Sequence, residues 1–189
     1  MSKIILPTGF WESEGKLYHV VCQPLCDWII NYLKNDKDKP LYDFGCGNGH
    51  YLNEFYNAGF SNLTGFEGCI PVQKEFENII CQDLTLSFSV ADKGNCVFLE
   101  VAEHIPSKYE NIMLDNVINA CNDKLIMSWA IIGQDGDGHV NCKNNNDVVK
   151  LLTSKGMKYL HQETIDARNS IPDSNPYGWF KTNTFIFEK

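Results

Sequence analysis

Short apolar segments alternate with helix-like segments along most of the chain, and this alternation constrains the fold more than any other feature. We expect strands at 41–45, 62–67, 79–84, 95–101 and 124–132. We expect helices at 50–60, 71–78, 106–121 and 146–156. Because the strands are short and mostly apolar, the pattern is typical of a parallel sheet that helices cover on both faces. The predicted fold class is therefore α/β, with a doubly wound sheet.

The two ends of the chain depart from this alternation. Residues 16–34 predict a helix that is interrupted or restarted at Pro24 and stopped by the segment NDKDKP. Segments 157–164 and 182–189 predict two closing strands, joined by a loop over 165–181 with no helix between them. We therefore expect an antiparallel last strand at one edge of a mostly parallel sheet.

The size and composition favour a single domain over residues 1–189, since 189 residues with 43% hydrophobic content can bury a sizeable core. No apolar run approaches the ~20 residues that span a bilayer, so we expect no membrane association. The N-terminus lacks the long apolar region of a secretory signal, which favours a cytoplasmic location. The eight cysteines contain no C-x-x-C pair and are expected to be reduced and structural.

The charge balance restricts the partners. The net charge is −8, and Arg168 is the only arginine among 16 basic residues. Arginine commonly binds phosphates and base edges through two N–H donors at once. Binding of nucleic acid by counterion release also needs a basic protein surface. The composition therefore argues against nucleic acid and favours a small-molecule ligand.

A glycine-rich turn, DFGCGNG, follows the first predicted strand and occupies residues 43–49. Glycines at such a turn let the backbone adopt positive φ and approach a ligand closely. The dinucleotide fingerprint is G-x-G-x-x-G, whereas here the third glycine, Gly49, comes one position early and His50 replaces it. Pyrophosphate binding, and with it a NAD-dependent oxidoreductase, is therefore weakly supported.

Two acids follow at the ends of the next two predicted strands. Glu67 lies about 20 residues after the glycines, the distance from which a carboxylate binds ribose hydroxyls. Asp83 ends the following strand. Alternatively, the glycine turn is only a tight turn, Glu67 is a solvated strand end, and Asp83 caps the next segment of the chain. A glycine loop with two spaced acids predicts a site for a nucleoside without phosphates.

These residues resemble the glycine loop and strand-end acids of the Rossmann-like (class I) S-adenosylmethionine-dependent methyltransferases. The resemblance covers about residue 15 to the C-terminus. It implies that the loop holds the methionine part of the cofactor, that Glu67 binds the ribose and that Asp83 reaches the adenine. The cofactor-binding residues that it implies are Asp43, Gly45, Cys46, Gly47, Glu67, Gly68, Asp83, Leu84 and Glu100.

The segment FLEVAEHIP, residues 98–106, ends the fourth predicted strand, where ligands bind in an open α/β sheet. Three interpretations remain open. Glu100 and Glu103 are polar rim residues, or His104 is a general base, or Glu100, Glu103 and His104 bind a divalent metal such as Mg²⁺ together with His139. In the catalytic interpretations, the residues concerned are His104, Glu103 and His139.

The E-x-x-E-H strand end with a later histidine is similar to a pattern in two methyltransferase groups. These are the small-RNA 3′-terminal 2′-O-methyltransferases and the ubiquinone-pathway O-methyltransferases, in which the pattern binds a divalent metal. Related segments also occur in methyltransferases without a metal. The expected reaction is methyl transfer from S-adenosylmethionine to a small-molecule acceptor. Oxygen is the favoured acceptor atom, because the acidic strand end can help to deprotonate a hydroxyl. A non-catalytic cofactor-binding module is the alternative.

Other aromatic and histidine residues have less specific interpretations. Residues 1–20 form either a lid over the cofactor or a cap on the core. His50 opens a helix beside the glycine loop, and Trp129 is expected in the core. His161 is expected to be structural, in an edge strand.

Overall fold

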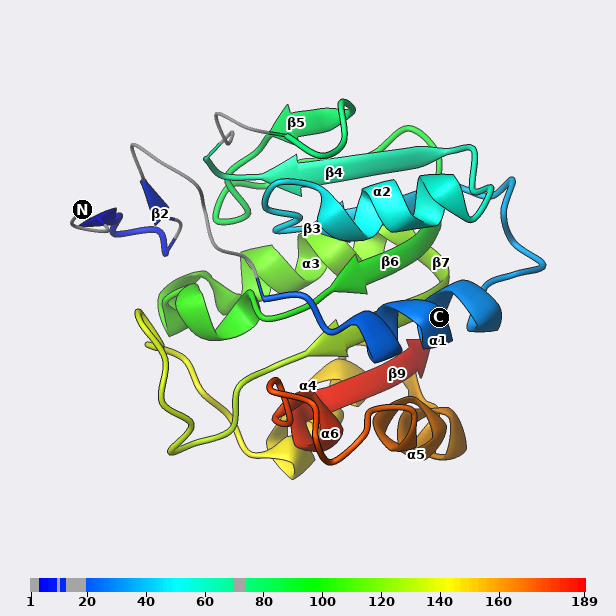
Figure 1. The fold of residues 1–189 in the computed structure, drawn as a ribbon. Helices are drawn as coiled ribbons and strands as arrows, with labels where there is room; N and C mark the ends of the chain where they lie inside the picture. The colour runs from blue at the N-terminus through cyan, green and yellow to red at the C-terminus, as the bar shows by residue number, and fades with distance from the viewer. Residues whose placement is uncertain (1–3, 10, 13–19, 70–73) are drawn as a thin grey trace.

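The structure is a computed structural model that describes residues 4–9, 11–12, 20–69 and 74–189 (Figure 1). Its centre is a seven-stranded sheet with the order β5-β4-β3-β6-β7-β9-β8. Six strands are mutually parallel, and β9 runs antiparallel to β7 and β8. The strands are β3 (Leu41–Phe44), β4 (Leu63–Glu67), β5 (Ile79–Cys81), β6 (Gly94–Phe98), β7 (Cys121–Ser128), β8 (Lys158–Tyr159) and β9 (Thr184–Glu188). The expected mostly parallel sheet with an antiparallel last strand is confirmed.

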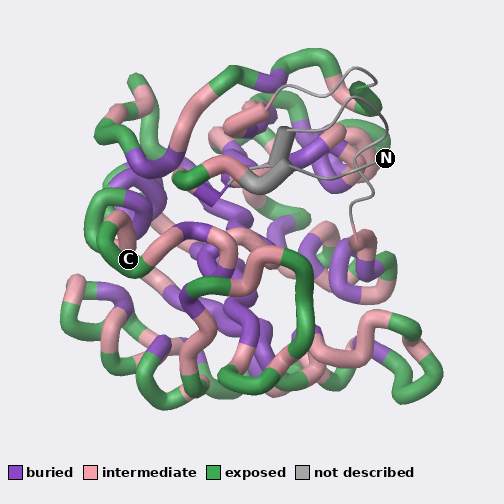
Figure 2. Tube along the Cα trace, turned by 90° about the vertical axis from the view of Figure 1, so that its left-hand side faces the viewer, coloured by how far each residue is buried: buried purple, intermediate pink, exposed green. Residues whose placement is uncertain are grey.

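Helices cover both faces of the sheet, as predicted. They are α1 (Gln23–Tyr32), α2 (His50–Asn57), α3 (Glu110–Ala120), α4 (Asn145–Ser154), α5 (His161–Asn169) and α6 (Phe180–Asn183). Alternate strand residues point to opposite faces, so Tyr42 and Phe44 join the core layer of α3 and α4, while Leu41 joins that of α1, α2 and α5. Trp129 is fully buried, as expected, and Figure 2 shows the buried residues running through the middle of the molecule.

The N-terminal part of the chain is described in pieces. A separate antiparallel pair joins β1 (Ile4–Ile5) to β2 (Trp11–Glu12). Most of the predicted lid over residues 1–20, and residues 16–19 of the first predicted helix, lie outside the described residues. Helix α1 begins at Gln23, so Pro24 lies in its first turn and does not interrupt it. Across the described parts of the chain, none of the helices has the length and apolar character that crossing a membrane requires.

Two predictions of local structure are wrong. Residues 157–164 are not one strand, because only Lys158 and Tyr159 pair with β9, and α5 begins at His161. The Thr164 hydroxyl and amide both donate to the Leu160 carbonyl, which turns the chain into the helix. Helices α5 and α6 therefore lie between the last two strands, and His161 is helical. Of the predicted helix 71–78, residues 71–73 lie outside the described part and 74–78 are not helical.

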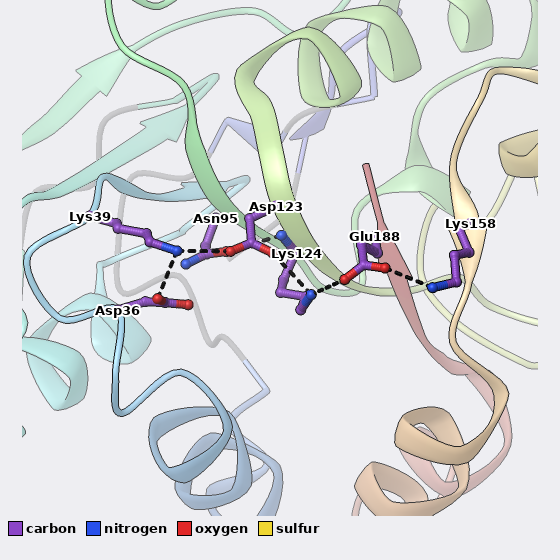
Figure 3. Close-up of polar contacts among 7 residues, drawn as sticks. All are labelled: Asp36, Lys39, Asn95, Asp123, Lys124, Lys158 and Glu188. Carbon is purple, nitrogen blue, oxygen red and sulfur yellow. Dashed lines mark hydrogen bonds and ion pairs between the residues drawn. The ribbon is translucent and has the colours of Figure 1, made fainter.

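A chain of ion pairs crosses the amino-terminal ends of the parallel strands (Figure 3). Lys39 Nζ lies 2.9 Å from Asp123 Oδ2, and Lys124 Nζ lies 2.9 Å from Asp123 Oδ1. Lys124 also pairs with Glu188, whose other carboxylate oxygen lies 2.9 Å from Lys158 Nζ. The chain of ion pairs thus connects the segment before β3 to β7, β9 and β8. It lies at the opposite end of the sheet from the residues predicted to be functional.

Candidate active site at the carboxyl ends of the strands

The predicted functional residues lie where the strand order reverses. From β3 the chain continues to β4 and β5 on one side, and it then returns to β6 and β7 on the other. Such a switch point is where open α/β sheets bind ligands, beyond the carboxyl ends of the strands. The glycine loop follows β3, and the acidic segment follows β6.

The glycine loop has a backbone that favours glycine at three positions. Gly45, Gly47 and Gly49 have φ values of 71°, 58° and 86°. A Cβ added to Gly45 would lie 2.4 Å from Cγ2 of Val101, so the loop also packs directly against the chain that follows β6. All three positions favour glycine for conformation, and Gly45 also for close approach.

Glu67 connects the end of β4 to the glycine loop. Its Oε2 accepts a hydrogen bond of 2.8 Å from the Gly47 amide, and its Oε1 accepts one of 3.2 Å from the Cys69 amide. Burial raises the pKa of Glu67, although the backbone hydrogen bonds oppose this change. The carboxylate therefore lies beside the loop, as expected, and it fixes the loop as well as facing the site.

Asp43 is a buried carboxyl group at the end of β3. The residue is 3% exposed, and its Oδ2 has no hydrogen-bond partner among the described residues. Burial first, and then the charge of Glu67, raise the pKa of Asp43 to about 8. Such a group is costly in the folded protein unless a ligand supplies a donor or a positive charge.

The other residues predicted to contact a cofactor have mixed environments. Oδ1 of Asp83 accepts hydrogen bonds of 2.8 Å from both the amide and the hydroxyl of Thr85, which is the capping role considered as an alternative. Leu84 and Cys46 are buried in the two core layers. Gly68 follows Glu67, and its carbonyl accepts from the Cys81 thiol. Contact of these residues with a cofactor stays a prediction.

A buried asparagine that the sequence interpretation missed holds the neighbouring loop. Asn116 on α3 donates to the carbonyls of Leu84 and Leu86 at 3.0 and 2.9 Å, and it accepts from the Phe88 amide at 3.1 Å. Asn116 therefore holds the segment after β5 against α3. The sequence signal that could have revealed this role is a polar residue, Asn116, beside the apolar Val117 in a predicted helix.

Glu100 has a strained backbone and a fully engaged carboxylate oxygen. Its φ is 56°, and it is the only non-glycine residue with positive φ in the described chain. Its amide donates to Ser128 Oγ at 2.7 Å. Its Oε1 accepts from Ser128 Oγ at 2.8 Å and from Asn183 Nδ2 at 2.9 Å. Glu100 therefore connects β6 to the ends of β7 and α6, a role that the sequence did not reveal.

Glu103 lies in a short 3₁₀ turn, Ala102–His104, and is completely buried. Neither carboxylate oxygen has a hydrogen-bond partner among the described residues. Burial, and then the charge of Glu100, raise the pKa of Glu103. Its backbone carbonyl accepts from the amides of Val140 and Asn141 at 2.9 Å each, which holds the loop after β7 against this turn.

Glu103, His104 and His139 come together, as predicted. One potential ligand atom from each lies within 4.8 Å of the other two, and the two imidazole rings have centroids 5.0 Å apart. Burial, and then His139, lower the pKa of His104 to about 4. Glu100, the fourth predicted ligand, is not a member of this group.

The orientation of His139 depends on two neighbours that the sequence interpretation missed. His139 Nδ1 lies 3.1 Å from the Gln134 carbonyl, to which it donates, so in the neutral ring Nε2 carries the lone pair. A Cβ added to Gly136 would lie 2.2 Å from Nε2, so a larger residue there would displace the ring. The loop thus holds the ring by a hydrogen bond and a close backbone contact, as metal-binding histidines are commonly held.

Comparisons with known proteins identify the fold. No protein-family model matches the chain, and no curated protein matches it. Among solved structures, a Burkholderia thailandensis 1,6-didemethyltoxoflavin-N1-methyltransferase matches with a TM-score of 0.65 and 12% identity, over 89% of this chain and 77% of that one. The magnesium protoporphyrin IX methyltransferase of Synechocystis PCC 6803 matches with a TM-score of 0.58 and 17% identity, over 88% and 77%.

A third structure, the methyltransferase domain of bacterial CtHen1-C, matches with a TM-score of 0.59 and 14% identity, over 88% of this chain and 96% of that one. The chain has the Rossmann-like fold of the class I S-adenosylmethionine-dependent methyltransferases.

Proposed function

We propose that this protein is an S-adenosylmethionine-dependent methyltransferase that methylates an oxygen atom of a small molecule. One observation carries the proposal. A glycine loop held by Glu67 lies at the switch point of a methyltransferase fold, beside a buried cluster of one carboxylate and two imidazoles. The first element suits the cofactor, and the second suits activation of an acceptor.

The residues at the end of β3 and β4 fit the cofactor. The sulfonium of S-adenosylmethionine supplies an electrophilic methyl group. The unpartnered Oδ2 of Asp43 suits the ammonium of the methionine part, and the loop at Gly45 and Gly47 has no side chains to obstruct it. Glu67, which lies beside the loop, is the proposed ligand of the ribose hydroxyls. Two of the structures with the same fold contain S-adenosylmethionine or S-adenosylhomocysteine, which supports this choice of cofactor.

The buried cluster fits a divalent metal. The two unpartnered oxygens of Glu103 and two imidazole nitrogens form a donor set that suits Mn²⁺, Zn²⁺ or Mg²⁺. Glu103, His104 and His139 would hold the ion. A metal there would lower the pKa of an acceptor hydroxyl, which makes oxygen the favoured target. Without a metal, His104 as a general base is the remaining route to the same reaction.

The loop after β7 supports a small, partly apolar acceptor. Ile132 and Val140 are 62% and 60% exposed on the same loop that carries His139. Large aliphatic side chains at the rim of a site favour an apolar or aromatic surface on the acceptor. The acidic residues around them disfavour a polyanion.

Calorimetry with S-adenosylhomocysteine and NAD tests the cofactor assignment. We expect saturable binding of S-adenosylhomocysteine and none of NAD. Glu67→Gln should weaken binding by about tenfold or more, since it loses a charged hydrogen-bond acceptor at the loop. Glu77→Gln, at an exposed site, is the control and should bind like the wild type. If the wild type does not bind S-adenosylhomocysteine, the protein is not a methyltransferase.

A further inference from the structure

A cavity lies at the far edge of the sheet, away from the glycine loop. It has a volume of about 440 Å³, within the range of small-ligand sites. Residues from α4, β8, α5 and β9 line it: Asn145, Asn146, Val149, Lys150, Tyr159, His161, Arg168 and Phe185. Neither the proposed cofactor site nor the buried metal cluster uses any of these residues.

The cavity exists because β8 is short. The two residues of β8 pair with the end of β9, at Glu188 and Phe187. After Leu160 the chain turns into α5, so no strand continues alongside the beginning of β9. The space beside Phe185 is closed instead by side chains from α4 and α5.

The charge of the lining is opposite to that of the whole protein. The chain has a net charge of −8 with 24 acidic residues, yet none of the lining residues is acidic. Lys150 and Arg168 are both basic, and Arg168 is the only arginine of the chain. The nearby acids Asp147 and Asp166 accept hydrogen bonds from Asn144 and Gln162 side chains and do not line the cavity.

Arg168 is held in position, and one of its terminal nitrogens has no partner among the described residues. Its Nε donates to the Thr184 carbonyl at 2.9 Å, and its guanidinium lies 5.2 Å from the centre of the Phe185 ring. Its Nη2 is buried and has no hydrogen-bond partner among the described residues. A guanidinium has five N–H donors and binds carboxylates and phosphates through two of them at once. A fixed arginine with an unsatisfied donor, in the lining of a cavity, suits an oxyanion ligand.

We propose that this cavity binds a small organic anion, whose carboxylate or phosphate group pairs with Arg168 and Lys150. The aromatic lining at Tyr159 and Phe185, together with the volume, indicates an organic body attached to the anionic group, which a free inorganic ion lacks. This site is independent of the proposed methyl transfer, and its occupancy does not depend on the cofactor.

Titration of the full chain, followed by nuclear magnetic resonance, tests the proposal with three probes: phenyl phosphate, benzoate and the neutral benzyl alcohol. We expect both anions to bind saturably, with dissociation constants on the order of 1 mM, and benzyl alcohol to bind at least about tenfold more weakly. Whichever anion binds more tightly identifies the anionic group that the site prefers.

Three variants locate the binding. Arg168→Lys should weaken phenyl phosphate by about tenfold, because an ammonium cannot present the two parallel donors of the guanidinium. Lys150→Gln should weaken both anions about fivefold. Lys150 is exposed, so this variant keeps the test valid if thermal unfolding shows that Arg168→Lys disturbs the fold. Lys93→Gln, exposed on the loop before β6, is the control and should bind like the wild type.

The proposal is overturned if neither anion binds saturably, or if benzyl alcohol binds as tightly as the anions. It is also overturned if the Lys150→Gln and folded Arg168→Lys variants bind both anions as tightly as the wild type.

Discussion

The two ends of the central sheet hold their charged residues in opposite ways. At the amino-terminal end, Lys39, Asp123, Lys124, Glu188 and Lys158 form a continuous chain of ion pairs near the surface. Hydrogen bonds from Lys124 and Lys158 lower the pKa of Glu188. Burial alone would raise the pKa of Asp123, but its hydrogen bonds from two lysines outweigh burial and lower it.

At the carboxyl-terminal end, carboxyl groups are buried without such partners. Asp43 is 3% exposed and Glu103 is fully buried, and burial raises the pKa of both. Each has at least one oxygen with no hydrogen-bond partner among the described residues. Glu100, close by, carries a strained backbone.

The difference separates structural from functional charge. Paired surface charges contribute a little to stability and are screened by salt. Buried unpaired carboxyl groups cost stability, and folding alone gives no reason to keep them. Groups of this kind cluster at functional sites because a bound ligand satisfies them. The contrast therefore favours the carboxyl-terminal end of the sheet as the place of the proposed cofactor and metal sites.

The largest effect is expected at the buried cluster. Glu103→Gln should lower Mn²⁺ affinity, measured by calorimetry, by about 100-fold or more, because it replaces a carboxylate ligand with a neutral amide. Glu100→Gln is the matched variant, since Glu100 lies outside the three-residue group and its amide oxygen can still accept from Ser128 and Asn183. It should change the affinity less than about threefold.

Two outcomes would revise the cluster. An equal loss in Glu100→Gln would restore the four-ligand set that the sequence predicted. If Mn²⁺, Mg²⁺ and Zn²⁺ all fail to bind the wild type, and EDTA leaves methyl transfer unchanged, the metal hypothesis is wrong. The two interpretations without a metal would then remain, with His104 as a general base or with the acids as polar rim residues.

Asp43 gives the next largest effect, on stability. Its pKa rises from 3.8 unfolded to about 8 folded, so the folded protein holds its proton more tightly and loses stability as pH rises between these values. Asp43→Asn removes this loss. We expect it to raise the free energy of unfolding by about 3–4 kcal/mol more at pH 7.5 than at pH 4.5, because the cost of the unpaired amide is the same at both pH values and only the linkage loss differs.

Urea denaturation of the two proteins at both pH values measures this difference. Asp92→Asn, which changes an exposed carboxylate, is the control and should show no such pH dependence. An Asp43→Asn variant that is less stable at pH 7.5 than the wild type would show that the carboxyl group is satisfied in the folded protein, and would remove half of the contrast between the two ends.

The sequence predicted the core of the fold because the central strands are apolar and separated by clear helices. It failed between residues 157 and 183, where the physical signals are weak. Helix α5 buries only Thr164 and Ala167, and Ile165 is its one other apolar residue, so no apolar stripe marks it. The alternation of apolar and polar residues in 157–160 made the predicted strand too long. The strand ends after two paired residues, because the Thr164 hydroxyl donates to the Leu160 carbonyl and the chain turns into a helix.

The site was predictable where reactive residues directly follow neighbouring parallel strands in the sequence. Glu103 and His104 are adjacent in sequence and follow a strand, and His139 follows the next strand, so topology alone brings them to one edge. Side-chain pairing was not predictable. Nothing in the sequence indicates that Glu100 bonds to Ser128 and Asn183, because these contacts depend on the register of β7 and β9 and on where α6 ends.

The smallest effect is expected at the amino-terminal end of the sheet. Glu188→Gln removes the pairs with Lys124 and Lys158, and should lower the unfolding midpoint at pH 7 by about 1–2 °C, since exposed ion pairs contribute little. The folded pKa of Glu188 lies below its ordinary value of 4.5, so this stabilisation is complete above that pH and is lost as pH falls further. The difference should also shrink in 1 M salt, whereas the gain from Asp43→Asn should persist, because a buried charge is poorly screened. The distinction between the two ends would fail if the midpoint change in Glu188→Gln were as large as that in Asp43→Asn, or insensitive to salt. Either result would mean that the charges at the amino-terminal end are also poorly screened by solvent.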